Sequence, residues 1–157
     1  MIMARNDQRR GGFSLIELLM AVSIVGILAG LAMPNLRNMT WRARATEVAA
    51  DVDVVRVSTN QFNADESAWP AEVGQGVVPP GLAPYLPESY SFQRDGYEID
   101  YDRISPVNVP GDPGTTQLIA VTVVIDTDEL SNAVIELLGG SIVWSVGRSH
   151  TFIIDRS

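Results

Sequence analysis

Apolar residues are concentrated near the start of the chain. Between Phe13 and Met33 the sequence runs for 21 residues with a single charge, Glu17. As a helix rising about 1.5 Å per residue, this run is roughly 32 Å long and can cross the hydrocarbon core of a bilayer. Its other interruptions are small residues that membrane helices tolerate, namely Ser14, Ser23, Gly26 and Gly30. The pattern therefore predicts a transmembrane helix over residues 13–34.

A cleaved secretory signal peptide is the alternative interpretation of this run. Its apolar region would span about 7–15 residues and would end at a small-residue cleavage site. The run here is longer, and the segment from Ala29 to Met33 matches such a site poorly. We therefore expect the apolar helix to remain part of the chain.

The helix is predicted to continue beyond the apolar run. No glycine or proline occurs from Asn35 to Ala64. Within this segment one set of residues recurs at steps of four and three: Val48, Val52, Val55, Thr59 and Phe62. This spacing is typical of one face of an amphipathic helix. We expect one helix of about 50 residues, kinked near Pro34, whose second part packs on the rest of the chain.

The remainder of the chain, residues 65–157, alternates between turn-rich and apolar segments. Asp95-Gly96 is typical of a type I′ turn, and Gly147-Arg148 occupies the same place in a second hairpin. The expected elements are a hairpin over residues 90–103, a strand over 118–125, a helix from Asp126 or Asp128 to Leu138, and a hairpin of strands 142–146 and 151–154. The predicted fold class is α+β, a long N-terminal helix packed on a small antiparallel β-sheet head.

Composition narrows the chemistry that the chain can perform. It has no cysteine and one histidine, His150, which argues against a disulfide framework, a zinc knuckle, a thiol nucleophile and a multi-histidine site. Its formal charge of −8 disfavours binding to nucleic acid through phosphate contacts. We predict no catalytic residue, no metal and no cofactor. Asp126, Asp128 and Glu129 could offer oxygen ligands to calcium, but without EF-hand spacing they fit the first turn of a helix better.

Glu17 is the one charge inside the apolar run. A carboxylate in the middle of a membrane helix costs about 2.5–3.5 kcal/mol on insertion scales. Glu17 therefore either lies at the membrane edge or needs a cationic partner, and no basic residue lies between Phe13 and Leu36. A cut between Gly12 and Phe13 would create an ammonium group at the start of the helix. That ammonium could pair with Glu17 of an adjacent copy, and such a contact, if it does not close, builds a filament.

The junction between the polar start and the apolar run resembles a known processing signal. Gly12-Phe13-Ser14-Leu15-Ile16-Glu17, with a basic leader before it and the run to Pro34 after it, closely resembles the class III signal of type IV pilins and type II secretion pseudopilins. The resemblance implies that a prepilin peptidase cleaves after Gly12 and N-methylates Phe13. It implies that Glu17 acts in processing and in subunit registration, and that Pro34 kinks the helix.

The resemblance also implies a location and a set of partners. Charge alone leaves the orientation open, because both flanks of the apolar run are basic. The family places the leader in the cytoplasm, the helix in the bacterial inner membrane and the head in the periplasm or outside the cell. The implied partners are other copies or other pilins, the prepilin peptidase, an assembly platform with its ATPase motor, and membrane lipid before assembly.

The sequence predicts four segments and one leading function. The segments are a leader (1–12), a transmembrane and polymerisation helix (13–34), an amphipathic continuation (35–64) and a β-rich head (65–157). The leading hypothesis is a structural subunit that polymerises into a type IV pilus or a type II secretion pseudopilus. The absence of cysteine departs from the many major pilins that close a C-terminal loop with a disulfide. The alternatives are a minor tip pilin for adhesion or substrate binding, and a single-pass membrane-anchored binding module that never polymerises.

Overall fold

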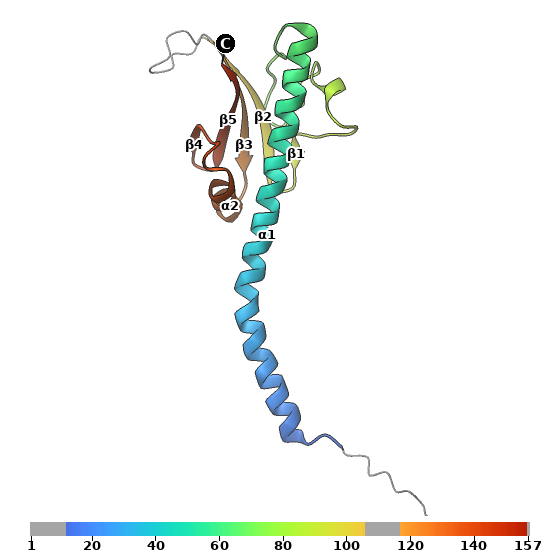
Figure 1. The fold of residues 1–157 in the computed structure, drawn as a ribbon, viewed down its shortest axis with the longest axis vertical. Helices are drawn as coiled ribbons and strands as arrows, with labels where there is room; N and C mark the ends of the chain where they lie inside the picture. The colour runs from blue at the N-terminus through green and yellow to red at the C-terminus, as the bar shows by residue number, and fades with distance from the viewer. Residues whose placement is uncertain (1–11, 106–116, 157) are drawn as a thin grey trace, which may run out of the picture. The chain divides into compact units, whose positions relative to one another are not determined.

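The computed structural model describes residues 12–105 and 117–156 (Figure 1). The first eleven residues of the leader and residues 106–116 lie outside the described residues. In chain order the elements are α1 (Leu15–Glu66), the 3-10 helix η1 (Ala83–Tyr85), β1 (Gln93–Arg94), β2 (Tyr97–Ile104), β3 (Leu118–Ile125), α2 (Asp128–Leu138), β4 (Trp144–Val146) and β5 (Ser149–Arg156). The chain divides into two compact units, residues 1–39 and 40–157, so α1 contributes a part to each.

The helix α1 is 52 residues long, which confirms the prediction of one long helix that continues past the apolar run. Its backbone is helical at position 34, and a kink there stays a prediction. The helix ends after Glu66, where Ser67 adopts a left-handed φ of 52°. The N–H of Ser67 donates a hydrogen bond to the carbonyl of Asn63 at 2.9 Å, so the last turn keeps a backbone partner.

The five strands form one antiparallel sheet in the order β1-β2-β3-β5-β4. The predicted α+β class and both predicted hairpins are confirmed. The long strands β2 and β3 pair along their whole length, from Tyr97 opposite Ile125 to Ile104 opposite Leu118. The short strands β1 and β4 lie at the two edges, which leaves β2, β3 and β5 as the body of the sheet.

The turn between β1 and β2 differs from the prediction. A type I′ turn requires positive φ at both central residues. Gly96 has a φ of 86°, whereas Asp95 is not among the residues with positive φ. Positive φ at the second central position alone is the pattern of a type II turn. The type I′ prediction was wrong because only the glycine, which has no Cβ, takes the left-handed conformation here.

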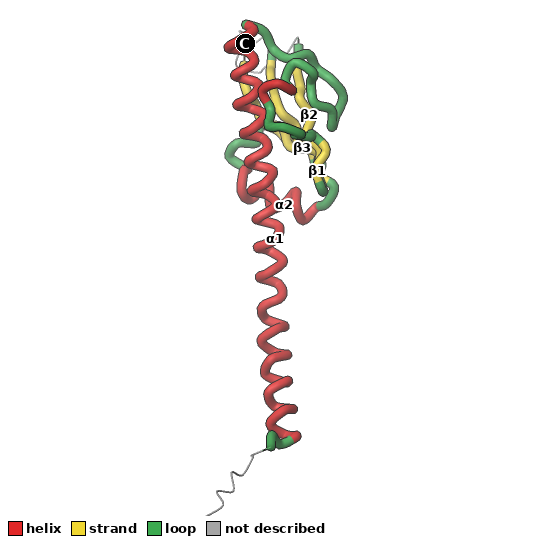
Figure 2. The backbone as a smooth tube through the Cα atoms, turned by 90° about the vertical axis from the view of Figure 1, so that its right-hand side faces the viewer, coloured by secondary structure: helices red, strands yellow, loops and turns green. Residues whose placement is uncertain are grey.

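The core of the second unit lies between one face of the sheet and the second part of α1. Figures 1 and 2 both show this part of α1 running along the sheet, close to β2 and β3. The predicted helical stripe is confirmed: Val48, Val52, Val55 and Thr59 are buried, and Phe62 packs at the edge of the core. The strands contribute the buried side chains of Tyr97, Ile99, Tyr101, Val121, Val123 and Phe152. Alternate residues of β2 are less buried and occupy the opposite, outer face of the sheet.

The short helix α2 lies over the predicted residues, but its N-cap is neither of the two predicted aspartates. Its N-cap residue is Thr127, which makes no side-chain capping bond, rather than Asp126 or Asp128. The fully buried His150 of β5 joins α2 to the sheet, because its Nε2 lies 2.8 Å from the Ser131 hydroxyl and its Nδ1 lies 2.8 Å from the Ser145 hydroxyl. Burial lowers the pKa of His150 below its ordinary value, which favours a neutral imidazole at this junction.

Candidate functional site

The candidate processing site lies at the start of α1. Gly12 and Phe13 precede the first helical residue and are both exposed, and 81% of the Phe13 surface is accessible. The peptide bond between them is therefore outside regular structure and open to another protein. Among the described residues, none has an atom within 4 Å of the position where a Cβ of Gly12 would stand.

Glu17 forms half of a helix capping box with Ser14. The Glu17 carboxylate accepts a hydrogen bond from the backbone N–H of Ser14 at 2.9 Å, and the Ser14 hydroxyl accepts one from the N–H of Ile16 at 3.3 Å. Both bonds satisfy N–H groups that a helix start otherwise leaves without partners. This neutral partner was not predicted, although Ser-x-x-Glu before an apolar run is the known sequence signature of a capping box. Glu17 thus has an intramolecular role before any second subunit is present.

The first part of α1 presents apolar side chains on every side. Within its membrane-length segment the large side chains are all more than half exposed: Leu15, Ile16, Leu18, Leu19, Met20, Val22, Ile24, Val25, Ile27, Leu28, Leu31 and Met33. The helix is long and apolar enough to cross a membrane, by length and composition. An apolar surface of this extent marks a membrane or protein contact, because exposure to water is unfavourable.

A cluster around Asp51 ties the second part of α1 to the first hairpin. The Asp51 carboxylate accepts hydrogen bonds from the hydroxyls of Tyr90 (2.9 Å) and Tyr97 (2.6 Å) and from two guanidinium nitrogens of Arg94 (both 2.9 Å). Burial raises the pKa of both phenols, and the hydrogen bonds to Asp51 raise it further, so both tyrosines remain donors. This cluster, which was not predicted from the sequence, holds the hairpin beside the helix.

Asp100 carries an unfavourable charge on the outer face of the sheet. Partial burial raises the pKa of its carboxyl to about 6, and repulsion from Asp102 and Glu72 contributes to the same shift. Because the folded pKa lies above the unfolded value, the folded state binds this proton more tightly. The stability contributed by the protonated group is therefore lost as the pH rises through about 6.

Replacing Asp100 with asparagine is expected to stabilise the protein at pH 7 by about 1 kcal/mol, a value discounted for the partial exposure of the carboxyl. The gain in the free energy of unfolding should shrink as the pH falls below 6 and vanish near pH 4. Urea unfolding of the full chain in detergent micelles measures this free energy at each pH. Glu98→Gln removes the same charge from the same strand face and controls for net charge. A gain that is equal at pH 4 and pH 7 would contradict the argument.

No group of three or more histidine, cysteine, aspartate or glutamate side chains is arranged to hold a metal ion in the part of the chain that the structure describes. Asp128 and Glu129 lie in the first turn of α2, whereas Asp126 precedes the N-cap residue Thr127. Negative charge at a helix start is favoured by the helix dipole, and this accounts for two of the three acids.

The start of the chain matches a known protein family. Residues 7–33 match the family described as the prokaryotic N-terminal methylation motif. This match contains the exposed Gly12–Phe13 bond, the capping box and the whole apolar run from Phe13 to Met33. It therefore coincides with the segment that both the sequence and the structure single out.

Relatives of known name align over a larger part of the chain. The type II secretion system core protein G of Klebsiella michiganensis is 30% identical over 113 residues, which cover 66% of this chain and 78% of that protein. The protein of the same name from Vibrio cholerae is 27% identical over 123 residues, covering 73% and 81%. A type IV major pilin protein of Neisseria gonorrhoeae is 33% identical over 69 residues, covering 44% and 32%. No solved structure matches the chain significantly.

Proposed function

The chain belongs to the family of type IV pilins and type II secretion pseudopilins, and we propose from this that it polymerises into a pseudopilus after cleavage between Gly12 and Phe13 and N-methylation of Phe13. As a member of this family it is a structural subunit of a pilus or pseudopilus and not an enzyme. The pseudopilus is preferred because the alignments to core protein G span most of those relatives, whereas the pilin alignment covers 32% of the pilin.

The exposed apolar helix behind an accessible Gly12–Phe13 bond is the observation that carries this proposal. Before assembly the apolar surface is covered by lipid of the inner membrane, with the leader in the cytoplasm and the head in the periplasm. Hydrolysis of the Gly12–Phe13 bond by a prepilin peptidase frees the amino group of Phe13. The same surface is then buried against helices of neighbouring subunits, so one segment serves first as anchor and then as filament core.

Glu17 links cleavage to polymerisation in this proposal. Within one chain its carboxylate is held by the Ser14 backbone. The methylated ammonium of Phe13 from an adjacent subunit supplies the positive charge that the apolar run lacks. The pairing neutralises Glu17 in a low-dielectric surrounding, where an unpaired charge is costly. An assembly platform and its ATPase motor are the proposed source of the work that moves each subunit out of the membrane.

The mass of the N-terminus tests the first step. In cells with an active prepilin peptidase, the purified chain is expected to begin at Phe13 and to carry one added methyl group. In cells without the peptidase, the leader up to Gly12 should be retained. Intact-mass and N-terminal peptide mass spectrometry distinguish these forms. Retention of the leader in the presence of the active peptidase would refute the proposed processing.

Deletion of the gene tests whether the chain is a subunit of a pseudopilus or of a pilus. Loss of protein secretion into the medium, with surface pili unchanged, is expected for a pseudopilus subunit. Loss of surface pili with unchanged secretion would assign the chain to a pilus instead. Complementation with the intact gene is the control for effects on neighbouring genes.

A further inference from the structure

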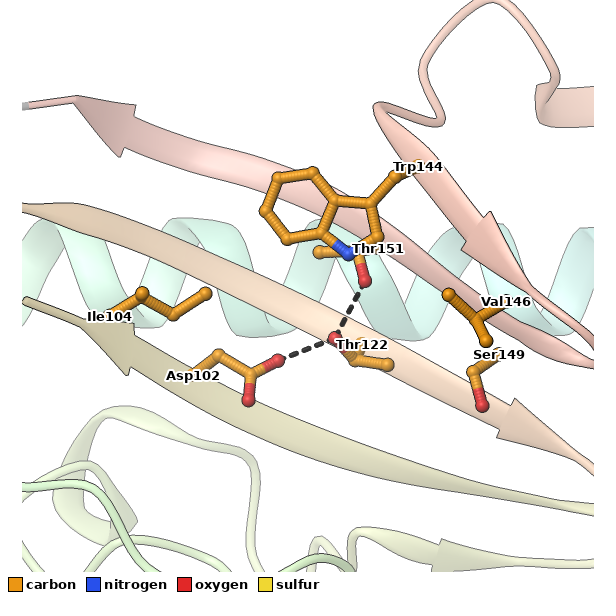
Figure 3. A pocket seen from close by; sticks show the side chains of 7 residues that line it. All are labelled: Asp102, Ile104, Thr122, Trp144, Val146, Ser149 and Thr151. Atoms are coloured by element: carbon orange, nitrogen blue, oxygen red, sulfur yellow. Dashed lines mark hydrogen bonds between the residues drawn. The ribbon is translucent and has the colours of Figure 1, made fainter. Parts of the chain in front are cut away.

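A small pocket lies on the outer face of the head sheet, opposite the face that packs on α1. Its volume is about 210 Å³. Its lining crosses four strands and includes Asp102, Ile104, Thr122, Trp144, Val146 and Thr151 (Figure 3). Pockets for drug-sized ligands are about 300–1,000 Å³. This pocket is smaller, and its size suits one side chain or one ring rather than an extended molecule.

A directed chain of hydrogen bonds forms the floor of the pocket. The Thr122 hydroxyl donates to the Asp102 carboxylate, and the hydroxyls of Thr122 and Thr151 lie 2.9 Å apart (Figure 3). A threonine has one hydroxyl proton. Because Thr122 gives its proton to Asp102, Thr151 must be the donor between the two threonines. The Thr151 oxygen and the second oxygen of Asp102 are then left as acceptors, so this floor is matched by a ligand that donates.

Apolar and aromatic surfaces border this floor. The Trp144 indole is 40% exposed although it belongs to a strand, and it lies beside Thr151 in Figure 3. Ile104 and Val146 are exposed at the two ends of the pocket. An indole face attracts cations more strongly than other aromatic side chains do, and it also accepts stacking by planar groups. The pocket thus combines a π surface with a carboxylate.

The pocket lies beside acidic side chains that are not paired with a basic side chain in the part of the chain that the structure describes. Among the described residues, Asp100, Asp102 and Glu72 form no ion pair. They lie close enough for Asp102 and Glu72 to repel the charge of Asp100. A cationic ligand would relieve this repulsion. A basic protein is a better source of such a ligand than a second copy of the chain, because the chain has 19 acidic residues against 11 arginines and a formal charge of −8.

We propose that this pocket binds the guanidinium group of an arginine presented by a basic partner protein, with Asp102 and Thr151 as acceptors and the Trp144 indole as the stacking surface. Arginine fits because it is planar, carries five N–H donors and no acceptor, and both pairs with carboxylates and stacks on aromatic rings. A lysine ammonium is a compact, strongly hydrated charge and uses the indole less well. The proposal concerns the head alone and holds whether or not the chain polymerises.

Fluorine NMR of the full chain in zwitterionic detergent micelles tests the proposal. The protein is labelled with fluorotryptophan, which gives three signals from Trp41, Trp69 and Trp144. The Trp144 signal is assigned with Trp144→Phe. The probe is a blocked Gly-Arg-Gly peptide, and the matched peptide contains citrulline, which keeps the planar shape but is neutral. The arginine peptide should shift the Trp144 signal saturably, and the citrulline peptide should not.

Variants of the pocket sharpen the test. Asp102→Asn is expected to weaken binding of the arginine peptide by about tenfold or more, because it removes a charge-assisted hydrogen bond. Glu98→Gln removes a charge from the same strand face and should leave binding within about twofold, because Glu98 does not line the pocket. Unchanged Trp41 and Trp69 signals show that each variant remains folded.

Four outcomes would overturn the proposal. Equal binding of the citrulline peptide would show that charge is not recognised. Unchanged binding by Asp102→Asn would place the peptide elsewhere. A Trp144 shift produced by a neutral disaccharide, or by raising the protein concentration without peptide, would assign the pocket to a carbohydrate or to a second copy. None of these outcomes depends on filament assembly, so the experiment tests the arginine pocket independently of the proposed polymerisation.

Discussion

Replacing Glu17 with alanine is expected to reduce filament formation by at least tenfold while cleavage after Gly12 continues. The substitution removes the only carboxylate of the apolar run, and with it the partner of the Phe13 ammonium in the adjacent subunit. Removing one member of a buried ion pair costs about 3–5 kcal/mol, since the remaining charge is left without a partner. That penalty recurs at every subunit added. Sheared filaments are quantified by immunoblotting, and processing is followed by mass.

The capping box offers two further substitutions that separate the effect of the Glu17 charge from that of its hydrogen bond to the Ser14 N–H. Glutamine at the third helical position also completes a capping box, so Glu17→Gln keeps the bond to the Ser14 N–H but removes the charge. Ser14→Ala removes the reciprocal hydroxyl bond to Ile16 and keeps the charge. If charge pairing drives assembly, both Glu17 variants fail and Ser14→Ala assembles. Normal filaments from Glu17→Ala would refute the pairing, and assembly by Glu17→Gln would assign the role of Glu17 to helix capping.

Most of the secondary structure could be predicted from the local spacing of apolar residues in the sequence. The step of four and three between Val48 and Phe62 predicted the buried face of α1, because a helix repeats every 3.6 residues. The strand over 118–125 was predicted at its observed bounds from a run of β-branched residues between turn-rich segments. These predictions succeeded because the responsible residues are neighbours in the chain.

Contacts between distant segments could not be predicted in the same way. The strand order places β5 between β3 and β4, and no pairwise pattern in the sequence specifies this. Asp51 was expected to fall largely off the buried face of α1, yet its partners Tyr90, Arg94 and Tyr97 lie about forty residues away. The outer pocket likewise combines residues of four strands. Some local features were also missed or mistaken, namely the capping box of Ser14 and Glu17, the type of the turn at Asp95-Gly96 and the N-cap of α2.

Replacing Asp51 with alanine is expected to lower the free energy of unfolding by about 2–4 kcal/mol, because the buried Tyr97, the half-buried Tyr90 and the exposed Arg94 lose their common acceptor. The Asp51 side chain is 14% exposed, so water cannot replace the lost bonds without rearrangement. The midpoint of thermal unfolding should fall by on the order of 10 °C for a unit of this size. Near-ultraviolet circular dichroism of the full chain in micelles reports the loss of tyrosine packing.

Asp53→Ala is the matched control for this prediction, since Asp53 lies on the same helix, is 68% exposed and pairs only with Arg56 among the described residues. Its effect should stay within about 0.5 kcal/mol, as for exposed ion pairs. The double variant Asp51→Ala with Arg94→Ala should recover part of the loss, because it removes the guanidinium that Asp51→Ala leaves without its acceptor. Equal effects at Asp51 and Asp53 would mean that helix charge, rather than the cluster, sets stability. A selective effect at Asp51 would show that its carboxylate contributes to holding the first hairpin on α1, beside the Arg44–Asp95 ion pair and the apolar core.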